Sequence, residues 1–332
     1  MERGYREEFG PESIAFFMGS GNTAVLGGGT ADGSVMQHLQ TVMGACSVLP
    51  DRDIAFQSAM SKMFGPGAAF VSPKEWSGAN HIVIWGCNPA VSCKRMMHLY
   101  LDAKEAGAQL TTIDIQYNTN VAKSDWYVPV HPATDGALVF GHLERSYCPG
   151  LAGLRILRAH TEAPFLVKED NTFLRMSDLG VPATEGPVNA MTGKPTVIDP
   201  EVVWDEATQS VKPYSEAEMP ALEGIPEEIE GFRIRPVWSM ILEAISAWTP
   251  ERASETCGVP VEDIKRLARM YGQEGPVLTG MNQGLNHYFN AIYTYDAIFY
   301  PHAYHGQHRQ AFRRRHFRRW QLRHQQLKGL HK

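Results

Sequence analysis

Three short polar motifs, each directly after an apolar run, carry the residue types that recognise a nucleotide. They read W-G-C-N-P at residues 85–89, I-D-I-Q-Y at 113–117 and P-A-T-D-G at 132–136. Their carboxylates and amides offer hydrogen bonds to ribose hydroxyls and to the edge of a base, and glycine lets the backbone approach a ligand closely. Each motif alone also fits an ordinary turn, because the same residue types end strands in many proteins. Three of them in order favour a nucleotide-like ligand.

Individual side chains in these motifs have distinct expected roles. Asn88 offers both donors and acceptors, and Gly86 leaves room for a ligand. Asp114, at the end of a predicted strand, is placed to accept hydrogen bonds from ribose hydroxyls. Asp135 is placed to accept hydrogen bonds from N–H groups on a base edge such as that of guanine.

The segments around the motifs alternate between strand and helix patterns. Strands are predicted at His81–Trp85, Leu110–Ile115 and Trp126–Val130, with helices at Val91–Ala106 and from Asp135 onward. This order gives right-handed crossovers between parallel strands. The predicted fold class is therefore α/β, with a doubly wound, mostly parallel, Rossmann-like sheet and an appended mixed α+β region.

The three motifs are expected to share one site. The carboxyl ends of parallel strands lie at the same edge of a sheet, and ligands of open α/β folds bind there. The loops Gly86–Pro89, Asp114–Gln116 and Thr134–Asp135 should therefore converge.

The composition of the 332 residues is that of a folded globular protein, with 43% hydrophobic and 20% charged residues. No apolar run approaches the ~18 residues of a membrane helix, and the first residues lack the apolar core of a signal peptide. The sequence therefore predicts no membrane-spanning segment, and it does not indicate a cellular compartment. The five cysteines form no C-x-x-C pair, so the usual signatures of a disulfide framework, a zinc site or an iron–sulfur cluster are missing.

The charge is unevenly distributed along the chain. The net charge is −5, yet residues 302–332 contain seven arginines, two lysines and no acid. Phe312, Phe317 and Trp320 lie among the arginines, as in arms that bind RNA. One interpretation is therefore a non-catalytic nucleotide-binding α/β module with a basic arm that binds nucleic acid.

The ordered motifs also resemble those of a known family, the molybdopterin oxidoreductases of the dimethyl sulfoxide reductase type. The matching motifs are W-G-C-N-P at 85–89, K-E-A-G-A at 104–108, T-T-I-D-I-Q at 111–116, A-K-S-D-W-Y-V-P-V-H-P-A-T-D-G-A-L at 122–138, T-P-E-R-A at 249–253, L-T-G-M-N-Q at 278–283 and N-H-Y at 286–288. The resemblance extends over most of the chain before the basic tail.

This resemblance implies a molybdenum or tungsten ion held by two molecules of molybdopterin guanine dinucleotide, and two-electron oxo- or hydroxyl-transfer chemistry. It implies that residues 85–92, 114–117 and 133–135 contact one dinucleotide, with further contacts on the pterin side. The residues expected to bind the cofactor are Trp85, Gly86, Cys87, Asn88, Pro89, Asp114, Gln116, Thr134, Asp135, Thr279 and Gln283.

The resemblance also implies a side chain that ligates the metal, shortly before a G-x-G turn such as residues 65–67. Asp51 and Asp53 lie in that window and are the catalytic candidates, with Asp51 as the candidate metal ligand. Both aspartates equally fit acids at the start of a helix. Cys46 lies slightly too early and fits a structural thiol.

Family members also have an iron–sulfur segment before this region and a further domain after it, so this chain is expected to be an inactive middle fragment. The iron–sulfur cluster is expected only in the full-length enzyme, together with a small-molecule substrate and an electron-transfer iron–sulfur subunit, and no nucleic acid is expected as partner. The expected division is 1–78 and 236–301 for the pterin-cofactor domain, 79–160 for a Rossmann-like dinucleotide-binding domain, 161–235 for an inserted loop and hairpin region, and 302–332 for the basic tail. The substrate and the choice of metal stay open.

Two stretches depart from the family pattern, His142–Leu157 and His302–Lys332. A shift of one nucleotide allows the codons of G-Q-H-R-Q-A, at 306–311, to encode G-N-I-G-K-P, which matches a glycine-rich turn of the family. Both stretches are therefore expected to be out of frame and to pack poorly. Divergence within one lineage is the alternative interpretation.

Overall fold

The computed structural model describes residues 2–17, 35–48, 54–64, 73–146, 154–188 and 193–304. Its α-helices are α1 Glu2–Phe9, α2 Val35–Met43, α3 Ile54–Phe64, α4 Pro89–Ser92, α5 Lys94–Glu105, α6 Asp135–Ser146, α7 Leu154–His160, α8 Val237–Ser246, α9 Pro250–Cys257, α10 Val261–Gly272 and α11 Ala291–Tyr304. Its strands are β1 Ala15–Phe17, β2 Cys46–Val48, β3 His81–Trp85, β4 Gln109–Asp114, β5 Trp126–Pro129, β6 Leu166–Lys168, β7 Thr184–Val188, β8 Pro195–Ile198, β9 Val202–Asp205, β10 Ser210–Pro213, β11 Glu228–Ile229, β12 Phe232–Pro236 and β13 Val277–Met281. Short 3-10 helices are η1 Pro11–Ser13, η2 Pro73–Gly78, η3 Val121–Lys123, η4 Met176–Leu179 and η5 Gln283–His287.

A parallel four-stranded sheet lies at the centre of the structure, in the order β13-β3-β4-β5. In β3, His81 pairs with Val277 of β13 on one side and with Gln109 of β4 on the other. All five residues of β3 are buried, as expected for a parallel strand covered on both faces. The predicted strands β3, β4 and β5 and their parallel arrangement are confirmed, and β13 adds a neighbour from far along the chain.

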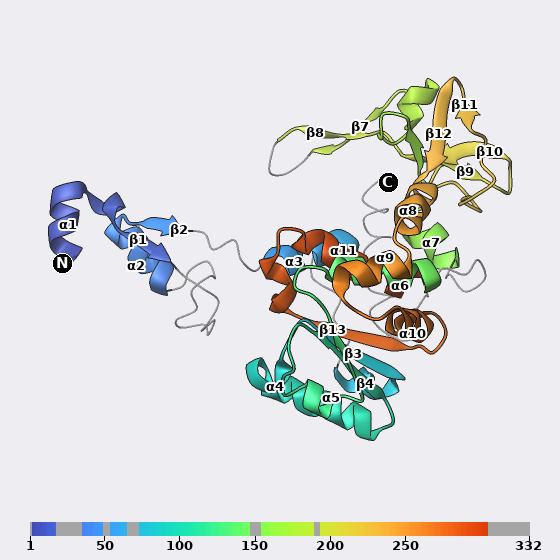
Figure 1. Cartoon of the computed structure of the whole chain (residues 1–332). Helices are drawn as coiled ribbons and strands as arrows, with labels where there is room; N and C mark the ends of the chain where they lie inside the picture. Colours follow the sequence, from blue (N-terminus) through green and yellow to red (C-terminus); the bar gives the residue numbers. More distant parts are fainter. Residues whose placement is uncertain are drawn as a thin grey trace.

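Helices cover both faces of this sheet, and alternate residues of β3 point to opposite sides. Ile82 and Ile84 belong to a core cluster with Met97 and Tyr100 of α5. Val83 and Trp85 belong to the larger core cluster, which includes residues of α6, α9, α10 and α11. Figure 1 shows α4 and α5 on one side of the strands and α6, α9 and α10 on the other.

Local sequence signals explain where these covering helices begin and end. The Thr249 side chain caps α9 by accepting from the backbone N–H of Arg252, and Pro250 occupies the first helical position. Gly258 ends the helix in the left-handed region, with a φ of 75°. In α10, Ile264 and Leu267 are buried at the spacing of one helical face.

The inserted region between α7 and α8 has a core of its own. Leu166, Leu174, Val202 and Ile234 form a separate buried cluster beneath β6, β9 and β12. β12 pairs antiparallel with both β6 and β11, while β9 and β10 form a hairpin. The β7–β8 hairpin extends away from this cluster (Figure 1).

Residues 2–17 and 35–48 form a small unit in which β1 pairs in parallel with β2. Figure 1 shows this unit apart from the central sheet. Within the described part of the chain, no helix is long and apolar enough to cross a membrane.

The expectation that residues 142–157 pack poorly is wrong for His142, Leu143 and Leu157, whereas Leu154, which is 40% exposed, agrees with it. α6 continues to Ser146, and His142, Leu143 and Leu157 are each at most 2% exposed. The hydrophobic residues join the larger core cluster because they continue the buried face of the helices that carry them. Residues 147–153 and 305–332 lie outside the described residues, so the same expectation stays untested there.

Candidate functional site

The carboxyl ends of all four parallel strands of the central sheet lie at the same edge. The backbone N–H of Gly86 donates to the carbonyl of Ile113 at 3.0 Å, which links the ends of β3 and β4. The Cys87 thiol donates to the carbonyl of Gly280 in β13, with 3.7 Å between Sγ and the oxygen. The expected convergence is therefore confirmed for the loops after β3 and β4.

Asp135 is joined to the end of β3 by one buried hydrogen bond. The indole N–H of Trp85 donates to Oδ1 of Asp135 at 2.7 Å. Trp85 is fully buried and Asp135 is 3% exposed. Burial raises the pKa of the Asp135 carboxyl, and the hydrogen bond from Trp85 partly offsets that rise. Trp85 thus lies beneath the edge, where its side chain supports Asp135.

Asp114 ends β4 with its carboxylate folded onto its own loop. Its Oδ2 accepts from the side-chain amide of Asn118 at 2.8 Å, and its Oδ1 accepts from the backbone N–H of Gln116 at 3.4 Å. Burial raises the pKa of Asp114. A ligand that bonded to this carboxylate would compete with Asn118, while the exposed Gln116 faces no such competition.

Asn120 connects the loops after β3 and β4 and was not among the expected binding residues. It is fully buried. Its Nδ2 donates to the carbonyl of Cys87 at 3.0 Å, and its Oδ1 accepts from the backbone N–H of Ala90 at 3.1 Å. The sequence feature that could have identified Asn120 is the N-T-N run at 118–120, because asparagines in the turn after a strand often hold the backbone of that turn.

The loop after β5 holds a strained residue next to Asp135. Ala133 has a φ of 66°, which residues other than glycine rarely adopt. The Tyr288 hydroxyl is hydrogen-bonded to the backbone of Ala133, and the Thr134 hydroxyl donates to the carbonyl of His131 at 2.7 Å. The conformation is thus held by groups from both sides of the edge, and Tyr288, which belongs to the N-H-Y motif, was not among the expected binding residues.

The η5 helix, Gln283–His287, crosses over the end of β3. A Cβ on Gly284 would overlap the carbonyl oxygen of Gly86, and Leu285 packs against the same glycine. The Asn286 side chain accepts from the backbone N–H of Phe56 in α3 at 3.1 Å. The segment therefore covers the end of β3.

Thr279 and Gln283, both expected on the pterin side, bond to the protein itself. The Thr279 hydroxyl lies 2.8 Å from the hydroxyl of Tyr271 in α10. The side chain of Gln283 accepts a hydrogen bond from that of Asn286. A direct role for either residue in binding would require these bonds to be exchanged.

The remaining expected residues differ in what they offer a ligand. Asn88 Oδ1 is buried and has no hydrogen-bond partner among the described residues. Pro89 is buried at the start of α4. Burial raises the pKa of the Cys87 thiol to about 12, so this cysteine is no thiolate nucleophile at neutral pH. Asn88 is therefore the side chain in this group whose unpaired oxygen could accept a hydrogen bond from a ligand.

The candidate metal ligands Asp51 and Asp53 lie outside the described residues, directly before α3. Within the ranges that the structure describes, no group of three or more His, Cys, Asp or Glu side chains is arranged to hold a metal ion. The expected ligand role thus stays a prediction.

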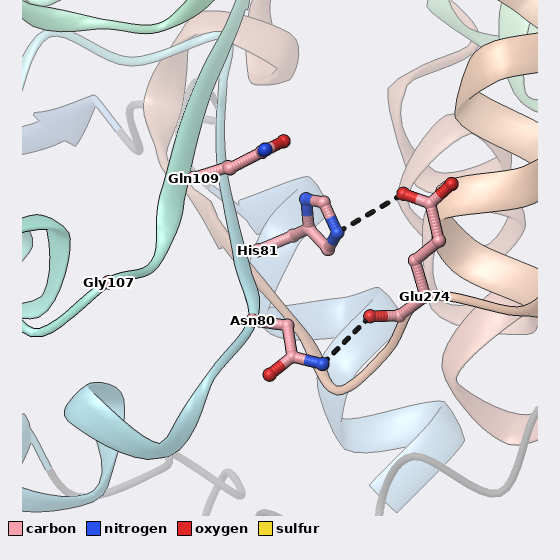
Figure 2. Close-up of a pocket in the computed structure, with 5 residues that line it drawn as sticks. All are labelled: Asn80, His81, Gly107, Gln109 and Glu274. Carbon is pink, nitrogen blue, oxygen red and sulfur yellow. Dashed lines mark hydrogen bonds and ion pairs between the residues drawn. The ribbon is translucent and has the colours of Figure 1, made fainter.

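A hollow lies at the opposite end of the sheet, where the strands begin. Figure 2 shows its lining residues, Asn80, His81, Gly107, Gln109 and Glu274. His81 Nε2 lies 3.3 Å from Glu274 Oε2, and the Asn80 amide donates to the Glu274 carbonyl at 3.0 Å. Burial lowers the pKa of His81. These bonds join the start of β3 to the segment after α10. The polar residues that line the hollow therefore have a structural role.

Comparisons with known proteins give distant but extensive similarity. No protein-family model matches the chain. The chain is 26% identical over 285 residues to the "Putative dimethyl sulfoxide reductase catalytic subunit" of Halobacterium salinarum, covering 82% of this chain and 31% of that protein. It is 26% identical over 241 residues to the alpha subunit of the perchlorate reductase of Dechloromonas aromatica, covering 65% of this chain and 26% of that protein. The chain therefore spans about a third or less of the length of these curated relatives.

A third relative and one solved structure extend the comparison. The alpha subunit of the dimethylsulfide dehydrogenase of Rhodovulum sulfidophilum is 22% identical over 295 residues, covering 87% of this chain and 31% of that protein. The structure of acetylene hydratase from Pelobacter acetylenicus superposes with a TM-score of 0.47 and 12% identity, over 92% of this chain and 31% of that chain.

Proposed function

Because the homologues of this chain are catalytic subunits of dimethyl sulfoxide reductase-type molybdopterin oxidoreductases, we propose that its sheet edge binds the guanine end of a molybdopterin guanine dinucleotide. In the proposed enzyme two such dinucleotides hold molybdenum or tungsten. The finer description of the fold as a doubly wound, Rossmann-like sheet belongs to this proposal, as do the domain boundaries at residues 78, 160 and 235.

The observation that supports the proposal best is the buried carboxylate of Asp135 at the edge where four parallel strands end. A carboxylate accepts from both N–H groups on the Watson–Crick edge of guanine, whereas adenine presents an acceptor at the corresponding ring nitrogen. Charge-assisted hydrogen bonds of this kind are the stronger ones in proteins. We therefore expect the proposed site to favour guanine over adenine.

Other groups at the edge fit a dinucleotide as well. Asn88 Oδ1 is a buried acceptor that lacks a partner among the described residues, so a ligand donor would remove an energetic penalty. Gly86 is proposed to contact the cofactor through its backbone, and Leu285 of η5 now fills the space beside its Cα. Asp114 and Gln116 are proposed to contact the ribose. These residues bind and orient the cofactor, and their arrangement requires no covalent step.

The bound cofactor would supply two-electron oxo or hydroxyl transfer. We assign no reaction step to the chain's own residues beyond holding the dinucleotide, with Asp51 or Asp53 kept as candidate metal ligands. Because two of the relatives are alpha subunits, we propose that the whole enzyme has an iron–sulfur partner subunit for electron transfer. Its small-molecule substrate and any iron–sulfur cluster belong to the same proposal.

We also propose that the reading frame is shifted at residues 302–332 and that the chain is inactive as a result. For residues 142–157 the burial of His142, Leu143 and Leu157 speaks against it. Sequencing the coding DNA and translating all three frames tests both stretches. A continuous family motif in a second frame would support the proposal, and its absence would leave lineage divergence as the explanation.

Guanine-nucleotide binding to the purified chain tests the proposed site. Isothermal titration should show that GDP binds more tightly than ADP. Asp135→Asn should weaken GDP binding about tenfold to a hundredfold, since a hydrogen bond to a charged group contributes about 1.5–3 kcal/mol. Asp102→Asn, the same change at an exposed position of α5, is the matched control. Equal affinities for GDP and ADP, or no effect of Asp135→Asn, would contradict the proposal.

A further inference from the structure

Trp85 is a polar donor at a place where an apolar side chain would fill the core as well. It ends β3, is fully buried, and belongs to the larger core cluster. Its indole N–H can only donate, and it donates to Oδ1 of Asp135 at 2.7 Å. A buried donor of this kind needs its acceptor, so the bond ties the two residues together.

We propose that Trp85 is a positioning residue, which fixes the Asp135 carboxylate for a guanine base without touching the nucleotide itself. This inference rests on the proposed function, because it concerns the same site. Under this proposal the selectivity for guanine depends on two residues. Asp135 contacts the base, and Trp85 lies beneath it and holds Asp135 in place.

The geometry explains how one bond can fix a carboxylate. Asp135 is the first residue of α6, so its backbone is held by the helix. Among the described residues, Trp85 is the one side chain that donates to it. The indole is immobilised by the surrounding core, and a Trp side chain has only two rotatable bonds. The bond therefore sets the plane of the carboxylate and leaves lone pairs on both oxygens for the base.

The surroundings of Asp135 show why the indole N–H is needed electrostatically. Within the described ranges, Asp135 interacts electrostatically with Asp114 of β4, with Tyr288 after η5 and with Cys257 at the end of α9. Burial and the charge of Asp114 favour the protonated carboxyl, whereas the N–H of Trp85 favours the carboxylate. Trp85 therefore helps to keep Asp135 ionised, and a carboxylate accepts from a base at both oxygens.

Removal of the indole N–H separates this role from simple packing. Trp85→Phe keeps an aromatic ring but loses the donor, and benzothienylalanine at position 85 keeps the bicyclic shape with sulfur in place of N–H. Trp126→Phe is the matched control, because Trp126 lies on β5 of the same sheet and stacks on Arg266 instead. The benzothienylalanine variant retains the test if Trp85→Phe does not fold.

Two readouts are needed, and the first requires no nucleotide. The pKa of Asp135, followed by carbon NMR in the chain with labelled aspartate, should rise in both position-85 variants and stay unchanged in Trp126→Phe. The affinity for GDP at neutral pH should fall roughly tenfold in the position-85 variants, with a smaller change for ADP. In Asp135→Asn the further loss of the N–H at position 85 should have less effect, because the two residues act through one bond.

The outcomes distinguish this inference from the proposed function. If the wild-type chain binds GDP, but the position-85 variants keep both its affinity and the pKa of Asp135, the positioning role is overturned and the site stands. If the wild-type chain does not prefer GDP over ADP, the proposed function and the guanine assignment are both overturned. A raised pKa of Asp135 together with weaker GDP binding supports the inference.

Discussion

Gly284 of η5 lies directly against the carbonyl oxygen of Gly86, at the end of β3, with no room for a Cβ between them. This contact joins the segment after β13 to the motif after β3, although almost two hundred residues separate them in sequence. It covers the end of β3, the strand whose last residue, Trp85, donates to Asp135. The cover over the end of β3 therefore depends on a contact between two glycines.

Gly284→Ala should displace the η5 segment. The added Cβ meets backbone, which cannot rotate away, so we expect a loss of about 1–3 kcal/mol in unfolding free energy. Amide hydrogen exchange at residues 283–288 should accelerate. Gly78→Ala is the control, since no atom lies within 4 Å of its added Cβ. Unchanged exchange in Gly284→Ala would show that the contact does not hold the segment.

Two glycines of α6 should respond in opposite ways to alanine. A Cβ on Gly141 would overlap that of Ala253 in α9, whereas the atom nearest to one on Gly136 is the Thr294 hydroxyl at 3.5 Å. Alanine favours a helix over glycine by about 0.5–1 kcal/mol, but overpacking costs about 1–3 kcal/mol. Chemical denaturation should show Gly141→Ala destabilised and Gly136→Ala neutral or stabilised. Similar stabilities for both variants would mean that α6 and α9 separate easily.

Asp205→Asn should reduce stability in a pH-dependent way. The Lys212 ammonium, 2.7 Å from Oδ2, and the backbone N–H groups of Met219 and Ala207 hold the pKa of Asp205 far below its ordinary 3.8. A lowered pKa contributes stability above the unfolded-state value, and this stability is lost as the pH falls. The melting temperature of the variant should thus lie below that of the wild type at pH 7.

The same difference in melting temperature should shrink as the pH falls below about 4, the ordinary range of an aspartate. Asp102→Asn on the surface of α5 is the control and should match the wild type at each pH. A constant gap between Asp205→Asn and the wild type at all pH values would show that shape, and not charge, is responsible.

The isolated chain should bind neither iron nor molybdenum stoichiometrically. Iron–sulfur clusters need about four thiolates in close array. The five cysteines of this chain form no C-x-x-C pair, and the described residues contain no metal-binding group of three or more side chains. Elemental analysis after expression in an anaerobic host that makes the cofactor is the measurement. One molybdenum per purified chain would contradict this prediction.

Local patterns in the sequence determined the strands that carry the site. The apolar run of β3 and the β-rich runs of β4 and β5, each followed by a polar motif, were sufficient to predict a parallel sheet with Asn88, Asp114 and Asp135 near one edge. This succeeded because strand periodicity, crossover handedness and the shared polarity of parallel strands are local or general rules. The ordered motifs likewise identified the family of the homologues.

Only the tertiary structure decided which groups meet at that edge. The bond between Trp85 and Asp135, the cover formed by Gly284 and the burial of His142 each depend on packing between segments far apart in the chain. No local pattern specifies such pairs, because the same residue types equally suit a solvated turn or an irregular helix. Packing of distant segments removed water from these side chains, and it thereby determined which hydrogen bonds and which charges the candidate site contains.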